Sequence, residues 1–157
     1  MQTSEQTKSH PGTDNRQVAT SEIVCLVDDD PSVRKSVGRL LESEGFSVRT
    51  FGDPTVFLEY LATNPVSVAV LDIWMENMTG MELLAHLCAR SPQTRVIFIT
   101  GHEDSAAEAT VTQAGVYAFF LKPFDDDKFL RAVHDAFKIA EAGPPTTPMS
   151  NANPLAA

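Results

Sequence analysis

The apolar run of residues 66–71, which ends abruptly in Asp72, constrains the fold of this chain more than any other stretch. The run is short and rich in β-branched side chains, and such a run between turn signals is typical of a strand buried on both faces. A carboxylate at the tip of a buried strand is costly unless it reaches solvent, a metal or a partner. Taken alone, Asp72 is best interpreted as a capping or turn residue, and only the other strand ends argue against that interpretation.

Three other apolar runs also stop at a polar or charged side chain. They are residues 23–27 before Asp28, Asp29 and Asp30, residues 95–99 before Thr100, and residues 118–121 before Lys122. A further run, residues 46–51, alternates apolar and polar side chains, which is typical of a strand at the edge of a sheet. The chain therefore predicts five strands, four of which carry a reactive group at their carboxyl end.

Helical spacing of apolar side chains follows each strand. The expected helices span approximately residues 31–44, 54–63, 80–90, 105–114 and 126–141. Asp30-Pro31 and Asp53-Pro54 are typical N-cap and first-turn pairs. In the second helix, the side chains expected to face the core are Val56, Phe57, Tyr60 and Leu61. The fourth helix has little apolar surface, so we expect low local stability and mobility there.

Strands that alternate with helices predict parallel strands joined by right-handed crossovers, with helices on both faces of the sheet. The expected fold is an α/β domain with a five-stranded parallel sheet in the order 2-1-3-4-5, a flavodoxin-like doubly wound arrangement. All carboxyl strand ends then lie on one edge, and the order reverses between strands one and three. Asp28, Asp29 and Asp72 are therefore expected to lie together, with Thr100 and Lys122 on the same edge.

The composition argues against two classes of partner. The net charge of −9 disfavours nucleic acid and anionic membrane, whose binding depends on clustered Lys and Arg, and no apolar run approaches the length of a membrane span. Residues 1–21 are expected to be a disordered leader, residues 22–142 the domain, and residues 143–157 a flexible proline-rich tail. Cys25 and Cys88 stand in no metal-ligand spacing and are interpreted as reduced core thiols of a cytoplasmic protein.

The chemistry of the shared edge follows from its charges. Three carboxylates that converge within a few ångströms repel one another, so either one keeps a proton or a cation binds. Hard oxygen ligands with open positions suit Mg²⁺, which keeps several waters and shares a phosphate oxygen. Acids, a cation site, a hydroxyl and the Lys122 ammonium together indicate the handling of a phosphoryl group, which a carboxylate can attack at phosphorus.

These strand ends resemble the receiver domain of two-component response regulators, in its stand-alone, chemotaxis-regulator-like form. The motifs that carry the resemblance, in the family's order and close to its spacing, are Val27-Asp28-Asp29-Asp30, Leu71-Asp72, Ile99-Thr100 and Leu121-Lys122-Pro123-Phe124. The resemblance spans approximately residues 22–141 and implies a signalling domain that catalyses only its own phosphotransfer and autodephosphorylation. It also implies a histidine kinase or histidine phosphotransfer protein as the phosphoryl donor and a downstream protein as the target.

The resemblance implies a metal site and an acceptor. Asp72 would be the phosphoacceptor. Asp28 and Asp29 would hold Mg²⁺, one of them through a water, together with Asp72 and the backbone carbonyl of Trp74.

The resemblance also implies a switch. Thr100 and Lys122 would each bind a phosphoryl oxygen, and Phe119 would be the aromatic side chain that swings inward with Thr100. The output surface would be the fourth helix, the fifth strand and the fifth helix. Phosphorylation-dependent homodimerisation is compatible with such a surface.

Trp74 and His102 stand two residues after the acceptor and two after the hydroxyl residue. In this family, side chains at these positions influence how water reaches the phosphoaspartate. The bulky Trp74 is expected to prolong the life of the phosphoryl group, and His102 to shield it or to orient water. Arg34 and Lys35 are interpreted as an ordinary solvated face, with a part in kinase docking as the alternative.

Three other functions are weighed against the receiver. A haloacid-dehalogenase-type phosphatase also uses an Asp at a strand end. It requires a second Asp two residues later as general acid, and Trp74 occupies that position here. A flavin-binding domain of the same fold would need a phosphate-cradling loop after the first strand, where three aspartates would repel phosphate. The third is a transcriptional regulator; no output domain follows residue 141, so direct DNA binding by this chain is not expected. Phosphate relay, phosphate drain and regulation of a protein partner are left open.

Overall fold

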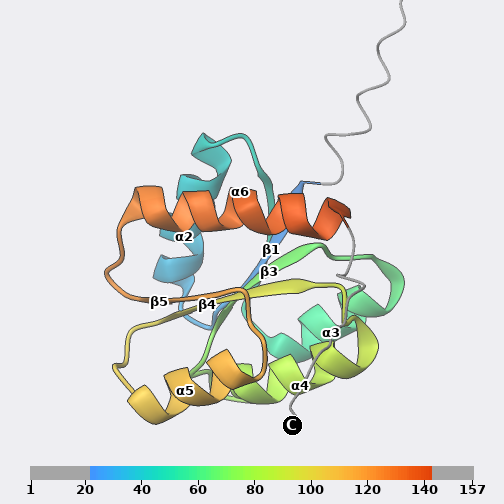
Figure 1. The fold of residues 1–157 in the computed structure, drawn as a ribbon, viewed down its shortest axis with the longest axis vertical. Coiled ribbons are helices and arrows are strands. Elements are labelled where there is room, and N and C mark those ends of the chain that lie inside the picture. Colours follow the sequence, from blue (N-terminus) through green and yellow to red (C-terminus); the bar gives the residue numbers. More distant parts are fainter. Residues whose placement is uncertain (1–21, 143–157) are drawn as a thin grey trace, which may run out of the picture.

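The computed structural model describes residues 22–142, which form a five-stranded sheet with helices on both faces (Figure 1). The strands are β1 (Ile23–Val27), β2 (Ser47–Phe51), β3 (Val68–Asp72), β4 (Arg95–Thr100) and β5 (Ala118–Leu121). The helices are α2 (Pro31–Ser43), α3 (Pro54–Thr63), α4 (Gly80–Arg90), α5 (Ser105–Gln113) and α6 (Asp126–Ala142). The expected leader and tail, residues 1–21 and 143–157, lie outside the described residues.

All strand pairs are parallel, and the sheet order is β2-β1-β3-β4-β5. The flavodoxin-like arrangement expected from the alternating pattern is therefore confirmed. Because the order reverses between β1 and β3, the crossovers leave these two central strands in opposite directions and open the sheet edge at their carboxyl ends.

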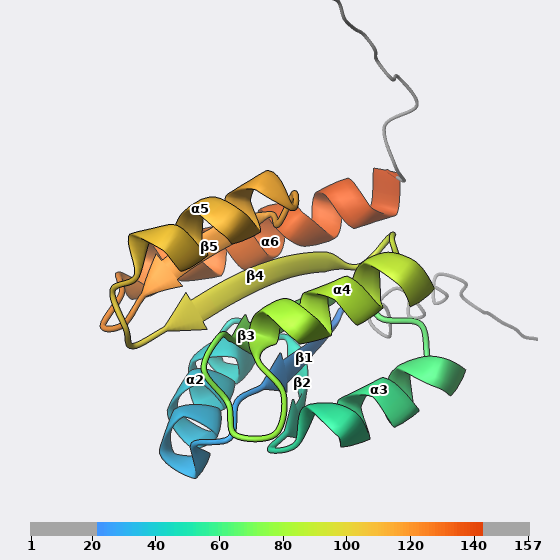
Figure 2. The same ribbon diagram turned by 90° about the horizontal axis from the view of Figure 1, so that it is seen from below.

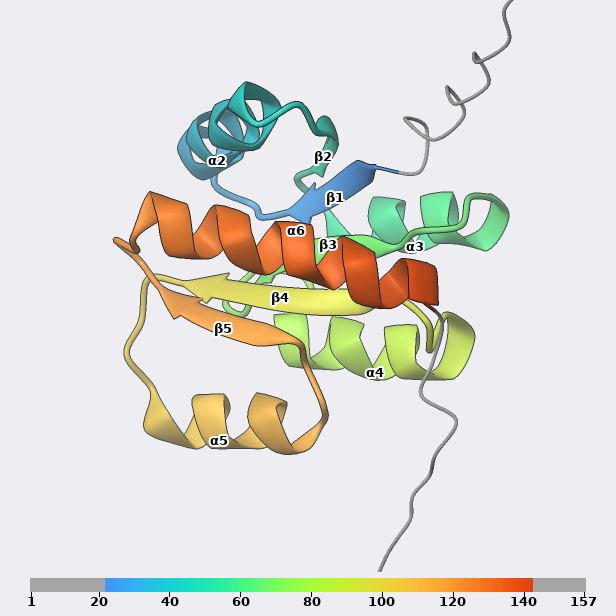
Figure 3. The same cartoon turned by 45° about the horizontal axis from the view of Figure 1, so that its top comes forward.

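Two apolar layers cover the sheet. α2 and α6 pack on one face, where Leu41 and Phe129 are buried, and α3, α4 and α5 pack on the other, where Phe57 and Leu83 are buried (Figures 1 and 3). Figure 2 shows α4 and α5 in front of the strands and α6 behind them. No helix within residues 22–142 combines the length and the apolar character that crossing a bilayer requires.

The local signals act as the sequence predicts. Asp30 and Asp53 cap α2 and α3, each accepting a backbone N–H two residues on at 2.9 Å. Every residue of β3 is buried, because the strand is covered on both faces. β2 stands at the sheet edge, and its side chains are only exposed or half-buried.

Three details differ from the sequence predictions. β3 begins at Val68 rather than residue 66. Val56 in α3 is 48% exposed, whereas Leu58 is buried, because apolar side chains surround this helix and their spacing does not define one face. Cys25 is a core thiol as expected, but Cys88 is exposed, since it lies on the outer side of α4.

α5 is the most weakly anchored helix on its face of the sheet. It buries only Ala107 and Val111, whereas α4 buries Leu83, Leu84 and Leu87 together with Gly80. This agrees with the small apolar surface read from its sequence. Burial of few apolar side chains gives a helix low local stability.

Candidate functional site

The carboxyl ends of β1, β3, β4 and β5 meet at one edge of the sheet. Val27 pairs with Leu71, and Asp72 pairs with Ile99, so the strand ends lie level. A hollow of about 260 Å³ opens there. It is lined by Asp28, Asp29, Asp30, Asp72, Trp74, Gly101, His102 and Lys122.

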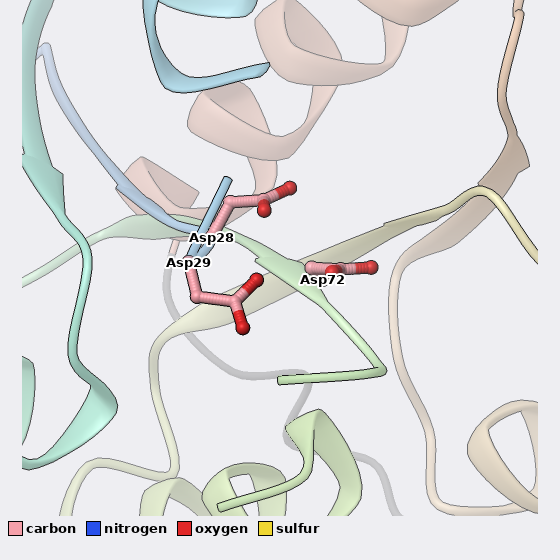
Figure 4. Close-up of side chains that lie close together, drawn as sticks. All are labelled: Asp28, Asp29 and Asp72. Atoms are coloured by element: carbon pink, nitrogen blue, oxygen red, sulfur yellow. The ribbon is translucent and has the colours of Figure 1, made fainter. Parts of the chain in front are cut away.

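Three carboxylates converge in this hollow, as the topology predicts. Asp28, Asp29 and Asp72 each place an oxygen within 4.8 Å of the others, and Figure 4 shows the three side chains gathered where β1 and β3 end. Asp28 is fully buried, Asp72 is 7% exposed and Asp29 is half-buried. The three carboxylates make the hollow strongly negative, and their charges repel one another.

Lys122 supplies the positive charge that faces these acids. Its Nζ lies 3.2 Å from Oδ2 of Asp28, while Oδ1 of Asp28 accepts the backbone N–H of Asp30 at 2.9 Å. The peptide bond between Lys122 and Pro123 is cis. The ammonium therefore pairs directly with Asp28, and Asp72 is left as the more weakly compensated carboxylate.

The pKa of Asp72 reflects this environment. Burial, followed by the charge of Asp28 and by the smaller effect of Asp29, raises the pKa of Asp72 from 3.8 to about 6. The ammonium of Lys122 and the backbone N–H of Trp74 act in the opposite direction. A carboxylate with a pKa near 6 is still mostly ionised at neutral pH, so Asp72 can act as a nucleophile there.

Two interactions that sequence analysis did not predict fix the positions of Asp28 and Asp29. Nη1 of Arg34 donates to the backbone carbonyl of Asp28 at 2.7 Å, so Arg34 is partly buried, and its interpretation as a solvated side chain is wrong. Lys35 is exposed, as expected. The backbone N–H of Glu76 donates to Oδ2 of Asp29 at 3.1 Å. These bonds position two of the three carboxylates.

Gly80 is a further residue that sequence analysis missed. It begins α4, and its N–H donates to the carbonyl of Ile73 at 2.7 Å. A Cβ atom at this position would collide with the backbone carbonyl of Asp72 and would lie 2.7 Å from Cε1 of Phe98. Glycine therefore allows the start of α4 to pack directly against the end of β3. A glycine at the first position of an otherwise ordinary helix is the only signal in the sequence.

Trp74 and His102 stand at the mouth of the hollow. Their ring centroids are 6.3 Å apart in an edge-on arrangement with an interplanar angle of 76°, and both side chains are exposed. Trp74 follows β3 and His102 follows β4, so the pair bridges the two loops. The sequence predicted both residues near the acceptor, and the structure also brings them together.

Thr100 and Phe119 lie beside the hollow and do not line it. Thr100 ends β4 and is fully buried, and its Oγ1 accepts the backbone N–H of His102 at 3.3 Å. Phe119 pairs with Phe98 across β4 and β5 and packs, partly buried, on the core cluster shared with α4 and α5. Their expected roles in a switch stay predictions.

The donor set fits a hard divalent cation. All three side-chain ligands are carboxylate oxygens, and one ammonium cannot offset three negative charges. Burial and, after it, the neighbouring negative charge of Asp28 raise the pKa of Asp72, so its ionised form is poorly compensated without a cation. Asp28, Asp29 and Asp72 are thus suited to hold Mg²⁺.

Comparison with known proteins agrees with this geometry. The family model of the response regulator receiver domain matches residues 24–134. Response regulator protein TmoT of Ectopseudomonas mendocina is 31% identical over 135 residues, covering 85% of this chain and 61% of that protein. Transcriptional regulatory protein GlrR of Escherichia coli (strain K12) is 37% identical over 113 residues, covering 72% of this chain and 26% of that protein.

A solved structure extends the agreement to three dimensions. The solution structure of the beryllofluoride-activated NtrC4 receiver domain dimer matches with a TM-score of 0.71 and 31% identity, covering 74% of this chain and 97% of that one. The chain belongs to the response regulator receiver domain family, which makes it a signalling domain rather than a phosphatase or a flavin-binding domain. It spans between about a quarter and three fifths of the length of such curated relatives.

Proposed function

We propose that this chain is a phosphorylatable receiver in which Asp72 accepts a phosphoryl group from the phosphohistidine of a histidine kinase or a histidine phosphotransfer protein. The observation that carries the proposal is the convergence of Asp28, Asp29 and Asp72 in one hollow with the ammonium of Lys122. A nucleophile, a cation site and a fixed positive charge are the parts that phosphoryl transfer needs.

In the proposed transfer, a carboxylate oxygen of Asp72 attacks the phosphorus atom. The phosphorus–nitrogen bond to the donor imidazole breaks, and its electron pair stays on the nitrogen. The product is an acyl phosphate on Asp72, which water later hydrolyses. Catalysis by the chain is limited to this transfer and to the loss of its own phosphate.

The other residues at the edge would bind the transferred group. Asp28, Asp29, Asp72 and the backbone carbonyl of Trp74 would hold Mg²⁺, which supplies charge neutralisation at the phosphoryl oxygens. Lys122, whose Nζ lies 3.2 Å from Asp28, would turn to a phosphoryl oxygen once Asp72 carries phosphate.

The proposed output is the surface formed by α5, β5 and α6. The hydroxyl of Thr100 would donate to a phosphoryl oxygen, and Phe119 would move inward with it. Support comes from the weak anchoring of α5, which buries only Ala107 and Val111, and from the partial burial of Phe119. Phosphorylation would then shift an equilibrium between two arrangements of this surface. The surface would bind a downstream protein or a second copy of the chain; the similar NtrC4 receiver domain is described as a dimer in its beryllofluoride-activated form.

A second candidate is the receiver part of a transcriptional regulator. The relative GlrR is named as one, and this chain matches only 26% of that protein. In that case DNA binding would belong to residues beyond the matched segment. The chemistry at Asp72 would be the same, so the two candidates differ only in what the output surface contacts.

The experiment that tests the main proposal is phosphorylation by a small donor. Acetyl phosphate with Mg²⁺ should add one phosphoryl group, detected by intact mass, and EDTA should prevent it. Asp72→Asn should remain unmodified. Asp30→Asn is the matched control, because Asp30 lines the same hollow but serves as the N-cap of α2, and it should be modified like the wild type. Absence of modification in the wild type with both small donors and kinases would falsify the proposal.

A further inference from the structure

A groove runs between α2 and β2, along the edge of the sheet that β2 forms. It has a volume of about 420 Å³ and shares no lining residue with the hollow that contains Asp72. The charged residues in its lining are Arg34, Lys35, Arg39 and Glu42, all from α2. Three cations and one carboxylate therefore border this α2–β2 groove, in a chain whose net charge is −9.

The outer edge of β2 carries backbone groups that the sheet does not use. β2 is the first strand in the sheet order, and within residues 22–142 it pairs only with β1. The carbonyl of Phe51 accepts the N–H of Asp28, which follows β1, at 3.0 Å. Backbone groups point to opposite sides at successive residues of a strand, so every second residue of β2, counted from Phe51, points towards β1. The N–H and carbonyl groups of Val48 and Thr50 consequently point away from the sheet.

The side chains of β2 show which charges border this edge. Val48 and Thr50 face α2, since both line the groove and a Cβ atom on Gly38 of α2 would lie 4.0 Å from Cγ2 of Thr50. Arg49 faces the other side of the sheet, where its guanidinium carbon lies 5.7 Å from the ring centroid of Tyr60. The unused backbone groups thus lie beside the cations of α2 on one face and beside Arg49 on the other.

Lys35 and Arg39 are the cations that a ligand in the groove can reach. Both side chains are exposed, they lie about one helical turn apart, and no ion pair between described residues involves either of them. Arg34 differs, because it is half-buried and its Nη1 donates to the carbonyl of Asp28 at 2.7 Å. A ligand that fits the groove therefore needs negative charge near Lys35 and Arg39 and a backbone that can pair with β2.

We propose that the α2–β2 groove binds an extended acidic segment of a partner protein, which adds to the sheet as a further strand beside β2. Backbone groups of the segment bond to those of Val48 and Thr50, and its carboxylates on the α2 side pair with Lys35 and Arg39. Charged side chains protect an edge strand from unspecific pairing, and cations at this edge favour an acidic strand. A second copy of the chain would bring Arg49 and the same α2 cations to the edge, so like charges oppose self-pairing.

The test is a titration of the unphosphorylated full chain with a short peptide, acetylated and amidated at its ends, in which Glu alternates with Thr. Amide chemical shifts should change saturably and only in α2 and β2. We expect a Kd on the order of 1 mM, because a short strand buries little surface, and weaker binding at higher salt. The same peptide with Gln in place of Glu should bind about tenfold more weakly. Shifts that do not saturate, or equal affinity for the two peptides, would overturn the proposal.

Backbone pairing is tested separately from charge attraction. Bound peptide should slow the hydrogen exchange of the Val48 and Thr50 amides about tenfold, whereas the amide of Arg49, which points towards β1, should change little. Two further peptides carry N-methyl groups on alternate residues, one on the Glu residues and the other on the Thr residues. Only the peptide whose methyl groups face β2 should lose binding. Equal affinity of the two methylated peptides would show that no strand is added.

Protein variants locate the charges that bind. Lys35→Gln combined with Arg39→Gln should weaken binding of the Glu peptide about tenfold or more. The matched control combines Arg131→Gln with Lys138→Gln, which removes two charges from exposed positions of α6 and should leave the Kd unchanged. An unchanged Kd in the first double variant, or an equal loss of affinity in both, would contradict binding in the groove.

Other occupants of the groove give different results. Slow hydrogen exchange of the Val48 and Thr50 amides before any peptide is added would mean that another segment of this chain, or a second copy, already covers the edge. A single-stranded oligodeoxynucleotide with the charge of the Glu peptide should not displace that peptide. Slow exchange in the free chain, or displacement by the oligodeoxynucleotide, would refute an acidic protein segment as the ligand.

Discussion

The two halves of the carboxyl edge are anchored very differently. In the β1–β3 half, every residue of β3 is buried, and α4 begins with a capping box between Thr79 and Glu82. In the β4–β5 half, α5 buries only Ala107 and Val111, and β5 has no fully buried residue. The acidic cluster stands on the firmly packed half, while Lys122 and the weakly anchored α5 belong to the other.

This difference matches two physical demands on one site. A nucleophile and its metal ligands act best when they are held in one geometry, because positioning removes part of the barrier. An output element must change position at small cost, and few buried apolar contacts make that possible. In the proposed function, the firmly packed half would carry the phosphotransfer and the weakly anchored half would carry the conformational response.

The largest expected effect is at the contact that fixes the β1–β3 half. Gly80→Ala forces a Cβ against the carbonyl of Asp72 and within 2.9 Å of Cα of Ile73, where backbone must move. We expect a loss of about 3 kcal/mol in the free energy of unfolding, measured by urea denaturation. The matched control is Gly101→Ala in the β4–β5 half, where a Cβ meets nothing within 4 Å; it should be neutral or slightly stabilising. Equal losses of unfolding free energy in Gly80→Ala and Gly101→Ala would show that the two halves of the edge are not packed differently at these positions.

The second prediction concerns the electrostatic strain in the β1–β3 half. The pKa of Asp72 is raised from 3.8 to about 6 in the folded protein, so between these values the folded state keeps a proton that the unfolded state has lost. The stability from this group is fully present below about pH 4 and is lost as the pH rises through about 6. In EDTA at about pH 7.5, Asp72→Asn should be more stable than the wild type by roughly 1–3 kcal/mol.

Two further measurements complete this test. The advantage of Asp72→Asn should shrink as the pH falls from about 6 towards about 4, because the carboxyl of Asp72 in the folded wild type then holds its proton and no longer buries a charge. Mg²⁺ should raise the thermal midpoint of the wild type at neutral pH and should raise that of Asp72→Asn much less. A stability difference that is independent of both pH and Mg²⁺ would contradict the electrostatic account.

The third prediction compares the local stability of α5 with that of α4. Backbone amides of α5 should exchange hydrogen for deuterium about tenfold faster than those of α4, because α5 has fewer buried side chains to hold it. Mass spectrometry of the unphosphorylated protein, with peptides that separate the two helices, reports this ratio. Equal protection of the two helices would show that burial does not set their local stability.

The smallest expected effect lies where the two halves touch. Trp74→Ala removes the ring that lies 6.3 Å from that of His102, and water should then reach a phosphorylated Asp72 more easily. We expect dephosphorylation roughly threefold faster, followed as loss of the phosphorylated mass. Trp74→Phe keeps an aromatic ring and should stay close to the wild-type rate. An unchanged or slower rate of dephosphorylation in Trp74→Ala would contradict the hypothesis that Trp74 shields the phosphoryl group from water.

Much of the fold was predictable because its signals are local. The caps at Asp30 and Asp53 and the apolar strands act over a few residues, and the observed elements begin and end close to the expected ones. The prediction that Val56 faces the core was wrong. Apolar side chains surround α3, so the side that becomes buried depends on how the helix packs on the sheet.

The membership of the acidic cluster was also predictable, for a topological reason. Parallel strands share one carboxyl edge, so residues that end strands must gather there, whatever their distance in sequence. This reasoning placed Asp28, Asp29, Asp72 and Lys122 correctly around one hollow. It could not show that Thr100 and Phe119 do not line that hollow. Topology places the end of a strand, but whether a residue there lines a cavity depends on the direction of its side chain.

By itself, then, the sequence determined the order of elements, the edge of the sheet that carries the chemistry and the residues that reach it. Tertiary structure alone decided that Lys122 pairs with Asp28, that Arg34 binds the carbonyl of Asp28, and that Gly80 lets α4 touch the end of β3. The physical reason is the separation along the chain over which each kind of interaction acts. Hydrophobic period and capping act between near neighbours, whereas the pairing of Lys122 with Asp28, 94 residues away, depends on how whole elements pack, and the contacts of Arg34 and Gly80 depend on the direction in which a helix leaves the end of its strand.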